Sequence, residues 1–536
     1  ENKREDMRMK KRTAARSMAA LMGAAMVLTA CGGGNTTAPT TGASSGGETQ
    51  TASESAESGK ITKTDIVVGQ ASDIVTLDPA GQQDTTSGVL MKHAYSTLLD
   101  VDNEGKVVPD LAESYEMKSD TEYVFKLRED ACFWDGTPVT AQDVKFSLDR
   151  AKGMPKTKSN TSKIEEVTVN GDHEVTIKLT EPYAAFKTIV TQHNLSILSE
   201  KAVTEAGDSY GDVDNLLGSG PFKVTEWVPN DHYTLVRNDN YWGEMPIATS
   251  ITCRVIPEGS ARTIALEAGE IDVVWSVDPT DCANVESNPD VKLLSQPSTG
   301  IDYVGMNTQK EKFSDKRVRQ AINYALDKQT FVDTIIEGRG LVANSYINAA
   351  IPGWTDEVEA YPYDPEKAKE LLAEAGYPDG FECSIFVNGD LRTRSAQILQ
   401  AQLADVGIKV DISTYEWGAL LDTLNAGEHE MFLLGWSNTS FDPDGSTYQL
   451  FYSGNHGATG NRAFFSNDKV DELILSAQRE SEESKRMELY KELQFVLHDE
   501  SPWCPLYYKE NNVGVRADLK GFTLHAGAQH YLGNCH

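Results

Sequence analysis

The sequence DPEKAKELLAEAGYP, residues 364–378, opens the part of the chain that decides its fold class. Asp364 is a good helix N-cap and Pro365 suits the first turn of a helix, so a helix should begin there. Gly376 and Pro378 are typical of the residues that follow a helix. We therefore expect a helix that begins at Pro365 and ends before Gly376.

The next stretch, ILQAQLADVGIKVDI at residues 398–412, changes from helical to strand periodicity at Gly407. The expected helical stripe consists of Ile398, Leu399, Leu403 and Val406. The expected strand face consists of Ile408, Val410 and Ile412. A further helix near Trp417 and an apolar strand at Met431–Trp436 complete a helix–strand–helix–strand order, which favours a sheet covered by helices.

The N-terminal half shows strand and hairpin patterns instead. DIVVGQA, residues 65–71, predicts a buried strand that ends in a loop. Apolar residues alternate on both sides of Asn170-Gly171, which predicts a hairpin within Ile164–Thr180. Because the two halves of the chain differ in this way, we expect separate domains.

The composition excludes nucleic-acid binding and favours a globular protein of more than one domain. Among 536 residues, 81 Asp and Glu outnumber 49 Lys and Arg, which gives a formal net charge of −32. Such a charge repels phosphate backbones, so we expect no binding to DNA or RNA. Hydrophobic residues make up 39% and charged residues 24%, as in ordinary globular proteins. The length is too great for a single core.

Residues 1–30 resemble the signal peptide of a bacterial lipoprotein. A basic head precedes the uncharged run Met18–Ala30, which is shorter than the roughly 20 apolar residues that span a bilayer. LTAC, residues 28–31, resembles a lipobox, which implies that Cys31 becomes a lipid-modified N-terminus. Residues 31–60 are rich in Gly, Ser and Thr and should form a flexible linker. The protein would then be extracytoplasmic and held to the cell membrane by this lipid alone, whereas the alternative for Cys31 is a buried cysteine.

Six cysteines follow Cys31 at positions too far apart for the CxxC pairs of a zinc site. They are Cys132, Cys253, Cys282, Cys383, Cys504 and Cys535. An extracytoplasmic location permits disulfides, and isolated buried thiols are the alternative that the spacing leaves open. We expect no metal and no other cofactor. No local pattern indicates a catalytic triad, so we expect no enzyme activity.

Several short motifs, each found once, follow one another in a characteristic order along the chain. They include VPDLAESY at 108–115, WDGTPVTAQDV at 134–144, GSGPF at 218–222 and DKRVRQAINYALD at 315–327. Their order and spacing resemble the peptide/nickel-type class (family 5, cluster C) of extracytoplasmic solute-binding proteins of ABC transporters. Dipeptide-, oligopeptide- and glutathione-binding lipoproteins belong to this class.

This resemblance implies an α/β, bilobal, type II periplasmic-binding-protein-like fold, with a hinge and an extra α+β domain inserted into the first lobe. By analogy, domain I comprises residues 61–104, 211–299 and 505–536. The inserted domain II comprises 105–210, and domain III comprises 300–504.

The resemblance also implies a function without catalysis. The protein would be a monomer that closes its lobes on a peptide or peptide-like solute and delivers it to ABC permease subunits. One alternative on the same fold is a chelated metal or a sugar as the solute. Another alternative is an anchored extracellular hydrolase.

GWSNTSFDPD, residues 435–444, resembles the family's ligand loop, in which Trp436 would form an aromatic wall, its alternative being a core residue. Peptide binders of the family commonly carry an Asp three residues after this Trp, which pairs with the α-ammonium of the ligand. This chain has Thr439 there. Losing one partner of a buried charge pair costs about 2–5 kcal/mol, so amine capture must be rearranged, weakened or absent. Asp442 is the nearest substitute, with a turn-capping role as its alternative.

A second loop carries Arg462, which is either a partner for a ligand carboxylate or a surface residue. The carboxylate-binding Arg of the dipeptide binders has no counterpart, because Phe386 aligns with it. From domain I, residues 70–73 and 84–87 should face the opening. The residues expected to contact the solute are Gln70, Ser72, Asp73, Thr85, Thr86, Trp436, Asn438, Thr439, Ser440, Phe441, Asp442 and Arg462.

Overall fold

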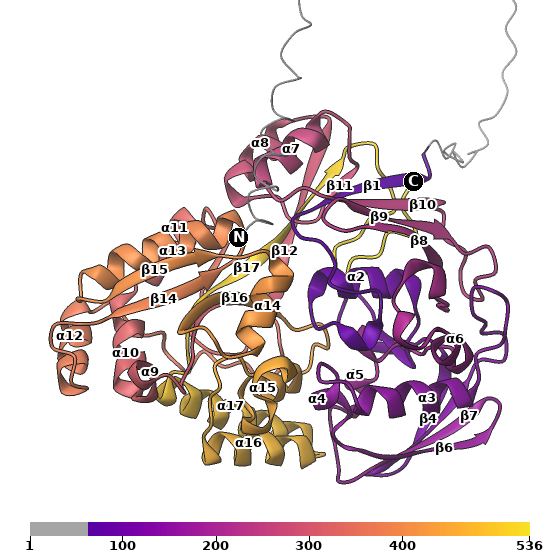
Figure 1. The fold of residues 1–536 in the computed structure, drawn as a ribbon, viewed down its shortest axis with the longest axis horizontal. Coiled ribbons are helices and arrows are strands. Elements are labelled where there is room, and N and C mark those ends of the chain that lie inside the picture. The colour runs from indigo at the N-terminus through magenta and orange to yellow at the C-terminus, as the bar shows by residue number, and fades with distance from the viewer. Residues whose placement is uncertain (1–62) are drawn as a thin grey trace, which may run out of the picture. The chain divides into compact units, whose positions relative to one another are not determined.

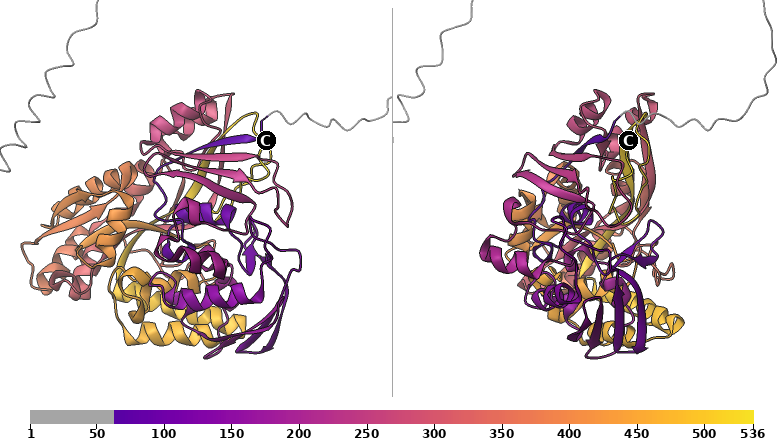
Figure 2. Two further views of the ribbon diagram at one scale, coloured as in Figure 1. Left: turned by 45° about the vertical axis from the view of Figure 1, so that its right-hand side comes forward. Right: turned by 90° about the vertical axis from the view of Figure 1, so that its right-hand side faces the viewer.

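The computed structural model describes residues 63–536, so the expected signal peptide, the expected linker and Cys31, the expected lipidation site, lie outside the described residues. In the described part, the strands form sheets of eleven, four and two strands. Figures 1 and 2 show how the helices are arranged around them.

Two long antiparallel strands, β12 (Val291–Met306) and β17 (Trp503–Arg516), run through the middle of the largest sheet. Their pairing shifts register between Pro297 and Ile301. Before this irregularity β12 pairs with the second half of β17, and beyond it β12 pairs with the first half. The two strands therefore connect two halves of the sheet, each of which has its own helices (Figure 1).

We call the half beside the end of β17 the N lobe. Its further strands, in order from β17, are β11 (Val273–Val274), β1 (Asp65–Gln70), β10 (Ser250–Val255), β9 (His232–Arg237) and β8 (Phe222–Val228). Its helices are α2 (Thr85–Ala94), α7 (Gly259–Glu267) and α8 (Cys282–Ser287). The strand expected at residues 65–71 is confirmed as β1, which lies parallel to both of its neighbours.

Residues 98–197 enclose a hydrophobic core of their own, and we call them the small-sheet region. Its four strands, in sheet order, are β4 (Ala112–Ser119), β5 (Glu122–Leu127), β7 (Glu174–Leu179) and β6 (Ile164–Gly171). The two-stranded sheet consists of β2 (Leu99–Val101) and β3 (Val107–Pro109). The helices here are α3 (Ala141–Lys152), α4 (Lys158–Thr161) and α5 (Phe186–Ile189), and α6 (Glu200–Ala206) follows.

The predicted hairpin is confirmed as β6 and β7, but its turn is displaced. Gly171 pairs with Glu174, so the two-residue turn is Asp172-His173 rather than Asn170-Gly171. Gly171 has a φ of 148° at the last pair before the turn. The glycine therefore relieves strain at the end of the strand, and the turn lies two residues later than expected.

We call the other half of the large sheet the C lobe. From β12 it continues with β16 (Met431–Ser437), β14 (Glu382–Val387) and β15 (Lys409–Thr414), while β13 (Gly340–Val342) pairs with β17. Its first helices are α9 (Glu311–Ser314), α10 (Lys316–Ala325), α11 (Lys328–Thr334), α12 (Pro365–Glu374) and α13 (Gly389–Ala404). The remaining helices are α14 (Trp417–Asn425), α15 (Asp444–Phe451), α16 (Asp468–Arg479) and α17 (Glu483–Glu500).

The helices and strands predicted within residues 364–436 are confirmed, and strand β14, between α12 and α13, was not predicted. The side chain of Asp364 accepts a hydrogen bond from the amide of Lys367 and so caps α12. Gly407, between α13 and β15, has a φ of 88°, a backbone conformation that glycine adopts at little cost. Both expected boundaries therefore follow from local chemistry.

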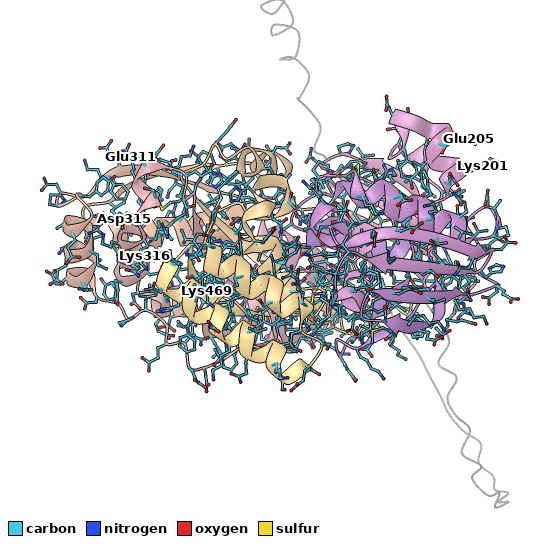
Figure 3. The ribbon with its side chains drawn as sticks, turned by 90° about the horizontal axis from the view of Figure 1, so that it is seen from below. Lys201, Glu205, Glu311, Asp315, Lys316 and Lys469 are labelled. Atoms are coloured by element: carbon cyan, nitrogen blue, oxygen red, sulfur yellow. The ribbon has the colours of Figure 1, made fainter. Side chains whose placement is uncertain are left out.

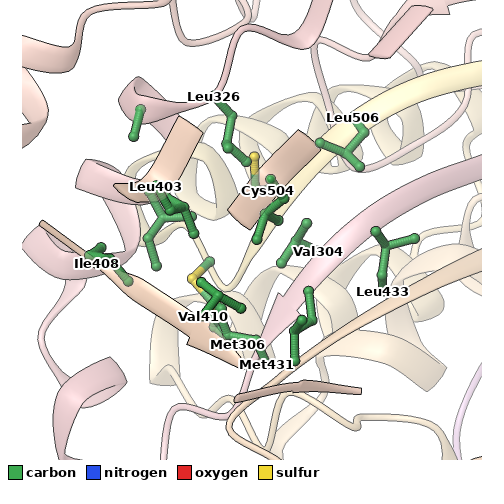
Figure 4. Packing of buried hydrophobic residues seen from close by; sticks show 14 of the residues in the cluster. Val304, Met306, Leu326, Leu403, Ile408, Val410, Met431, Leu433, Cys504 and Leu506 are labelled. Carbon is green, nitrogen blue, oxygen red and sulfur yellow. The ribbon is translucent and has the colours of Figure 1, made fainter. Parts of the chain in front are cut away.

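The first four residues of β16, Met431–Leu434, are all apolar because both faces of the strand are buried there. Met431 and Leu433 belong to a core with α10–α13, which Figure 4 shows from close by. Phe432 and Leu434 belong to a second core, with α14–α17. Alternate residues of a strand point to opposite faces of the sheet, so a strand covered on both sides has no polar position.

The surface and the cysteines agree with an acidic globular body. Charged side chains, Lys201, Glu311 and Lys469 among them, cover the face shown in Figure 3. The six cysteines after Cys31 are all free thiols, Cys132 alone being partly exposed, so the isolated-thiol alternative applies. Between residues 63 and 536, no helix has the length and apolar character needed to cross a bilayer.

Candidate ligand-binding cavity

A cavity of about 380 Å³ lies between the two lobes beside Trp436. Ligand sites commonly have volumes of roughly 300–1,000 Å³. The N lobe lines it with Ser72, Gln83, Asp84, Thr85, Thr86 and Trp275. The C lobe lines it with Asn388, Arg392, Trp417, Trp436, Thr439 and Arg462. The small-sheet region adds Asn160, Gln192, His193 and Asn194, and the C-terminal segment adds Gln529 and His530.

Strand β16 and the loop that follows it place Trp436 and Thr439 at one wall of the cavity. Trp436 pairs with Ile301 of β12, close to the register shift, and its indole donates a hydrogen bond to the Gly445 carbonyl at 3.1 Å. The hydroxyl of Thr439 donates to the side-chain oxygen of Gln192 at 2.8 Å. Thr439 therefore contacts the small-sheet region in the position where peptide binders commonly carry an Asp.

Four predicted site residues of the same loop do not line the cavity. The side chain of Asn438 donates to the Asp442 carbonyl at 2.7 Å, and Ser440 donates to Asn438 at 2.9 Å. Phe441 packs edge-on against His525. These side chains hold the loop in shape.

Asp442, the expected substitute for the missing Asp, is committed to a partner inside the C lobe. Both of its carboxylate oxygens accept hydrogen bonds from the guanidinium of Arg486. One oxygen also accepts from the amide of Asp444, two residues on. The structure thus places Asp442 in the capping role that was its alternative, outside the cavity.

The predicted residues of the N lobe divide in the same way. Ser72, Thr85 and Thr86 line the cavity, whereas Gln70 and Asp73 do not. Gln70 is buried at the end of β1. The carboxylate of Asp73 accepts hydrogen bonds from the Trp227 indole and from the backbone amide of Asn230, and so joins the loop after β1 to β8 and to the turn that follows it.

Arg462 and Asp84 bring opposite charges to the cavity without an ion pair between them. Arg462 is only 6% exposed, and its Nε donates to the side-chain oxygen of Asn425 at 3.0 Å. Burial lowers the pKa of Arg462, because no carboxylate of the described residues pairs with it. One oxygen of Asp84 caps α2 through the amide of Ser87, while the other is buried without a partner. Burial accordingly raises the pKa of Asp84.

Two of the buried thiols are unreactive near neutral pH. Burial raises the pKa of Cys253 and of Cys535 to about 12, so neither thiol is a nucleophile near neutral pH. Within residues 63–536, no cluster of three or more His, Cys, Asp and Glu side chains is arranged to hold a metal. The cavity instead offers aromatic surfaces and unpaired polar atoms, which suit the reversible binding of a polar solute.

Residues 106–458 match the model of the family described as bacterial extracellular solute-binding proteins, family 5 Middle. The chain belongs to this family. The glutathione-binding protein GsiB of Shigella boydii is 32% identical over 86% of this chain and 92% of that protein. The dipeptide-binding protein of Escherichia coli K12 is 30% identical over 80% of this chain and 86% of that protein.

A solved structure confirms the predicted fold class of this family 5 protein. DppA of Helicobacter pylori, in complex with the peptide STSA, superposes with a TM-score of 0.83 at 29% sequence identity. The match covers 88% of this chain and 98% of that one. The N and C lobes are therefore the lobes of a bilobal, type II periplasmic-binding fold.

Several residues lining the cavity of this family 5 protein were missed in the sequence. The indole nitrogens of Trp275 and Trp417 are buried without a hydrogen-bond partner in the described structure. The guanidinium of Arg392 stacks over the ring of Trp417 and lies 3.9 Å from the buried carboxylate of Asp302. The sequence marked Trp417 only as the start of an expected helix. Trp275 and Arg392 had no signal in the sequence, because only the folded chain brings them to the cavity.

Proposed function

We propose that this chain is the solute-binding component of an ABC importer, which captures a peptide or peptide-like solute between its lobes and delivers it unchanged to permease subunits. One observation supports this above the others. The cavity is walled by both lobes, and polar atoms from both, including the indole nitrogens of Trp275 and Trp417, form no hydrogen bond with the described residues. Buried polar groups normally have a partner, so a polar solute that fills the cavity gains hydrogen bonds from each lobe.

Contacts between the lobes explain how such a solute would shift the protein to a closed form. Arg394 of the C lobe pairs with Asp278 of the N lobe at 2.6 Å, and Arg339 pairs with Glu286 at 2.6 Å. Ion pairs at the surface contribute only about 0–1 kcal/mol each. A solute that touches both lobes binds the closed form best and so supplies the differential affinity that closure requires. The register shift of β12 is the natural place for the lobes to turn.

The remaining parts of the proposal concern organisation and location. Residues 1–30 act as a signal peptide, Cys31 carries the lipid, and residues 31–60 form the linker to an extracytoplasmic monomer. Domain II is the inserted segment 105–210. The small-sheet region, with its separate core, supports this division of the chain.

A binding screen tests the proposal. Di-, tri- and tetrapeptides, glutathione and sugars are added to the protein, and thermal unfolding and calorimetric titration are recorded. At a hundredfold excess over Kd, a true ligand stabilises the protein by about 2.7 kcal/mol. One-to-one binding of a peptide without product supports a binding protein. A released hydrolysis product would support the hydrolase instead, and failure of every peptide would contradict the proposal.

A pair of tryptophan variants tests the location of the site. Trp436→Ala should weaken binding of the best peptide at least tenfold, because it removes one wall of the cavity. Trp354→Ala is the matched control. Trp354 is a half-buried residue of the C lobe whose indole donates a hydrogen bond of 3.1 Å to the Asn344 side chain, and it does not line the cavity. Equal affinities of the two variants would place the site elsewhere.

A further inference from the structure

Asp84 has a carboxylate oxygen that helix capping does not use. Its first oxygen accepts the Ser87 amide at 2.9 Å, which satisfies the first turn of α2. Its second oxygen is buried and forms no hydrogen bond with the described residues, although the Trp417 indole is its neighbour. Asp84 also lines the cavity. A carboxylate in this setting gains most from a cation that enters the cavity.

Arg462 complements Asp84 from the C lobe. Apart from the bond of Nε to Asn425, its guanidinium makes no hydrogen bond or ion pair with the described residues, and it lines the same cavity. Asp84 is near enough for its charge to act on Arg462, yet the two groups form no ion pair. A buried anion and a buried cation thus face one space from opposite lobes.

The usual position for capturing an ammonium is occupied by a side chain without charge. Thr439 stands there, and its hydroxyl is bonded to Gln192. Asp442 is bonded to Arg486 and does not line the cavity. Glu510 also lines the cavity, but Asp84 carries the buried carboxylate oxygen that forms no hydrogen bond with the described residues. Asp84 is therefore the carboxylate that we assign to an ammonium group beside Arg462.

Resting on the proposed function, we propose that Asp84 and Arg462 together bind one unmodified α-amino acid group of the solute, Asp84 its ammonium and Arg462 its carboxylate. The solute class is peptide-like molecules that carry an ammonium and a carboxylate on the same carbon, as γ-glutamyl peptides do. One such group pairs both buried charges at once. Because the two side chains come from different lobes, it also joins the lobes.

An ordinary α-peptide does not satisfy this pair equally well. Its ammonium and its terminal carboxylate are at opposite ends of the chain, about 3.3–3.6 Å further apart for each added residue. One of the two buried charges then stays without a partner. Lys156 is the other cation near Asp84, but it does not line the cavity and burial lowers its pKa.

Three tripeptide probes of nearly equal size test the inference by calorimetric titration. They are γ-Glu-Cys-Gly, the same tripeptide with an α linkage, and N-acetyl-γ-Glu-Cys-Gly. The γ-linked probe should bind at least tenfold more tightly than either of the others, because only it presents both free groups on one carbon. Equal binding of the three would overturn the inference while leaving the proposed function intact. Failure of these and of all ordinary peptides would count against the proposed function itself.

Two variants test which group of the solute each charged side chain binds. Asp84→Asn keeps a good helix cap and should lower affinity for γ-Glu-Cys-Gly at least tenfold. Arg462→Gln should abolish the preference for the γ linkage, because the two linkages differ only in which carboxylate of the glutamyl residue is free. Asp73→Asn, an N-lobe acid that does not line the cavity, is the control and should bind as the unmodified protein does. An unchanged affinity of Asp84→Asn, or a retained γ preference in Arg462→Gln, would overturn the inference. Lys156→Gln should leave the preference unchanged.

Discussion

Two arginines of the C lobe are almost equally buried but differ in their partners. Arg462 is 6% exposed and Arg486 is 7% exposed. Arg486 donates to both carboxylate oxygens of Asp442. Arg462 donates only to the amide oxygen of Asn425 among the described residues. Burial lowers the pKa of both guanidiniums, but Tyr490 and Asp442 raise that of Arg486 above its usual value, whereas that of Arg462 stays lowered.

The difference shows that burial alone does not assign a role to a charge. A buried pair that is complete within one lobe stabilises that lobe, and it has no capacity left for a solute. A buried charge without a carboxylate partner weakens the empty protein and gains when a solute supplies one. The predictions that follow compare these two sites.

Breaking the pair of Arg486 and Asp442 should have the largest effect on the free energy of unfolding. Arg486→Met leaves the buried Asp442 without its partner, beside the second buried carboxylate of Asp444. We expect the free energy of unfolding to fall by about 3–5 kcal/mol, measured by urea denaturation. Lys485→Met, an exposed neighbour on α17, is the control and should change it by less than about 0.5 kcal/mol. Similar stability of the two variants would show that the pair does not stabilise the lobe.

The second largest effect should be on how the free energy of unfolding depends on pH, through the ionisation of Asp444. Burial, and then the charge of Asp442, raise the pKa of Asp444 to about 6. The charged and hydrogen-bonding groups packed against it are Tyr183, Asp442, Gln478, Arg486 and Tyr490. Since the folded pKa lies above the unfolded value of 3.8, the stabilising contribution is complete below pH 4 and is lost as the pH rises through 6.

Asp444→Asn should remove this dependence. Relative to the unmodified protein, the variant should gain about 3 kcal/mol between pH 4 and pH 7, since each pKa unit corresponds to about 1.4 kcal/mol. Unfolding in urea at several pH values measures the difference. A constant difference over this range would show that Asp444 does not titrate in it.

A smaller effect, on the affinity for peptide, is expected at the contact between the small-sheet region and the C lobe. The hydroxyl of Tyr183 donates to Asp444 at 2.5 Å. If this contact forms on closure, Tyr183→Phe should weaken peptide binding about tenfold, because hydrogen bonds to charged groups contribute about 1.5–3 kcal/mol. Tyr115→Phe, at an exposed tyrosine, should bind peptide as the unmodified protein does. Unchanged affinity of Tyr183→Phe would exclude the contact from closure.

The sequence predicted elements better than it predicted contacts. The helix at Pro365 and the strand at Met431 were predicted, because capping chemistry and periodicity are local. The pairing of Asp442 with Arg486 was not, since the two residues are 44 positions apart and only the packing of α17 beside the loop brings them together. Trp275 lines the cavity for the same reason, with no neighbour in sequence that marks it.

The smallest effect on the free energy of unfolding is expected at Arg462. Arg462→Met removes a buried charge and costs the hydrogen bond to Asn425, and these two terms have opposite signs. A typical hydrogen bond contributes about 0.5–1.5 kcal/mol, and relief of an unpaired buried charge offsets it. The free energy of unfolding without solute should therefore change by less than about 1 kcal/mol, in contrast to Arg486→Met. Urea denaturation of both variants at pH 7 measures the contrast. A loss at Arg462→Met as large as that at Arg486→Met would mean that Arg462 supports the fold rather than the solute.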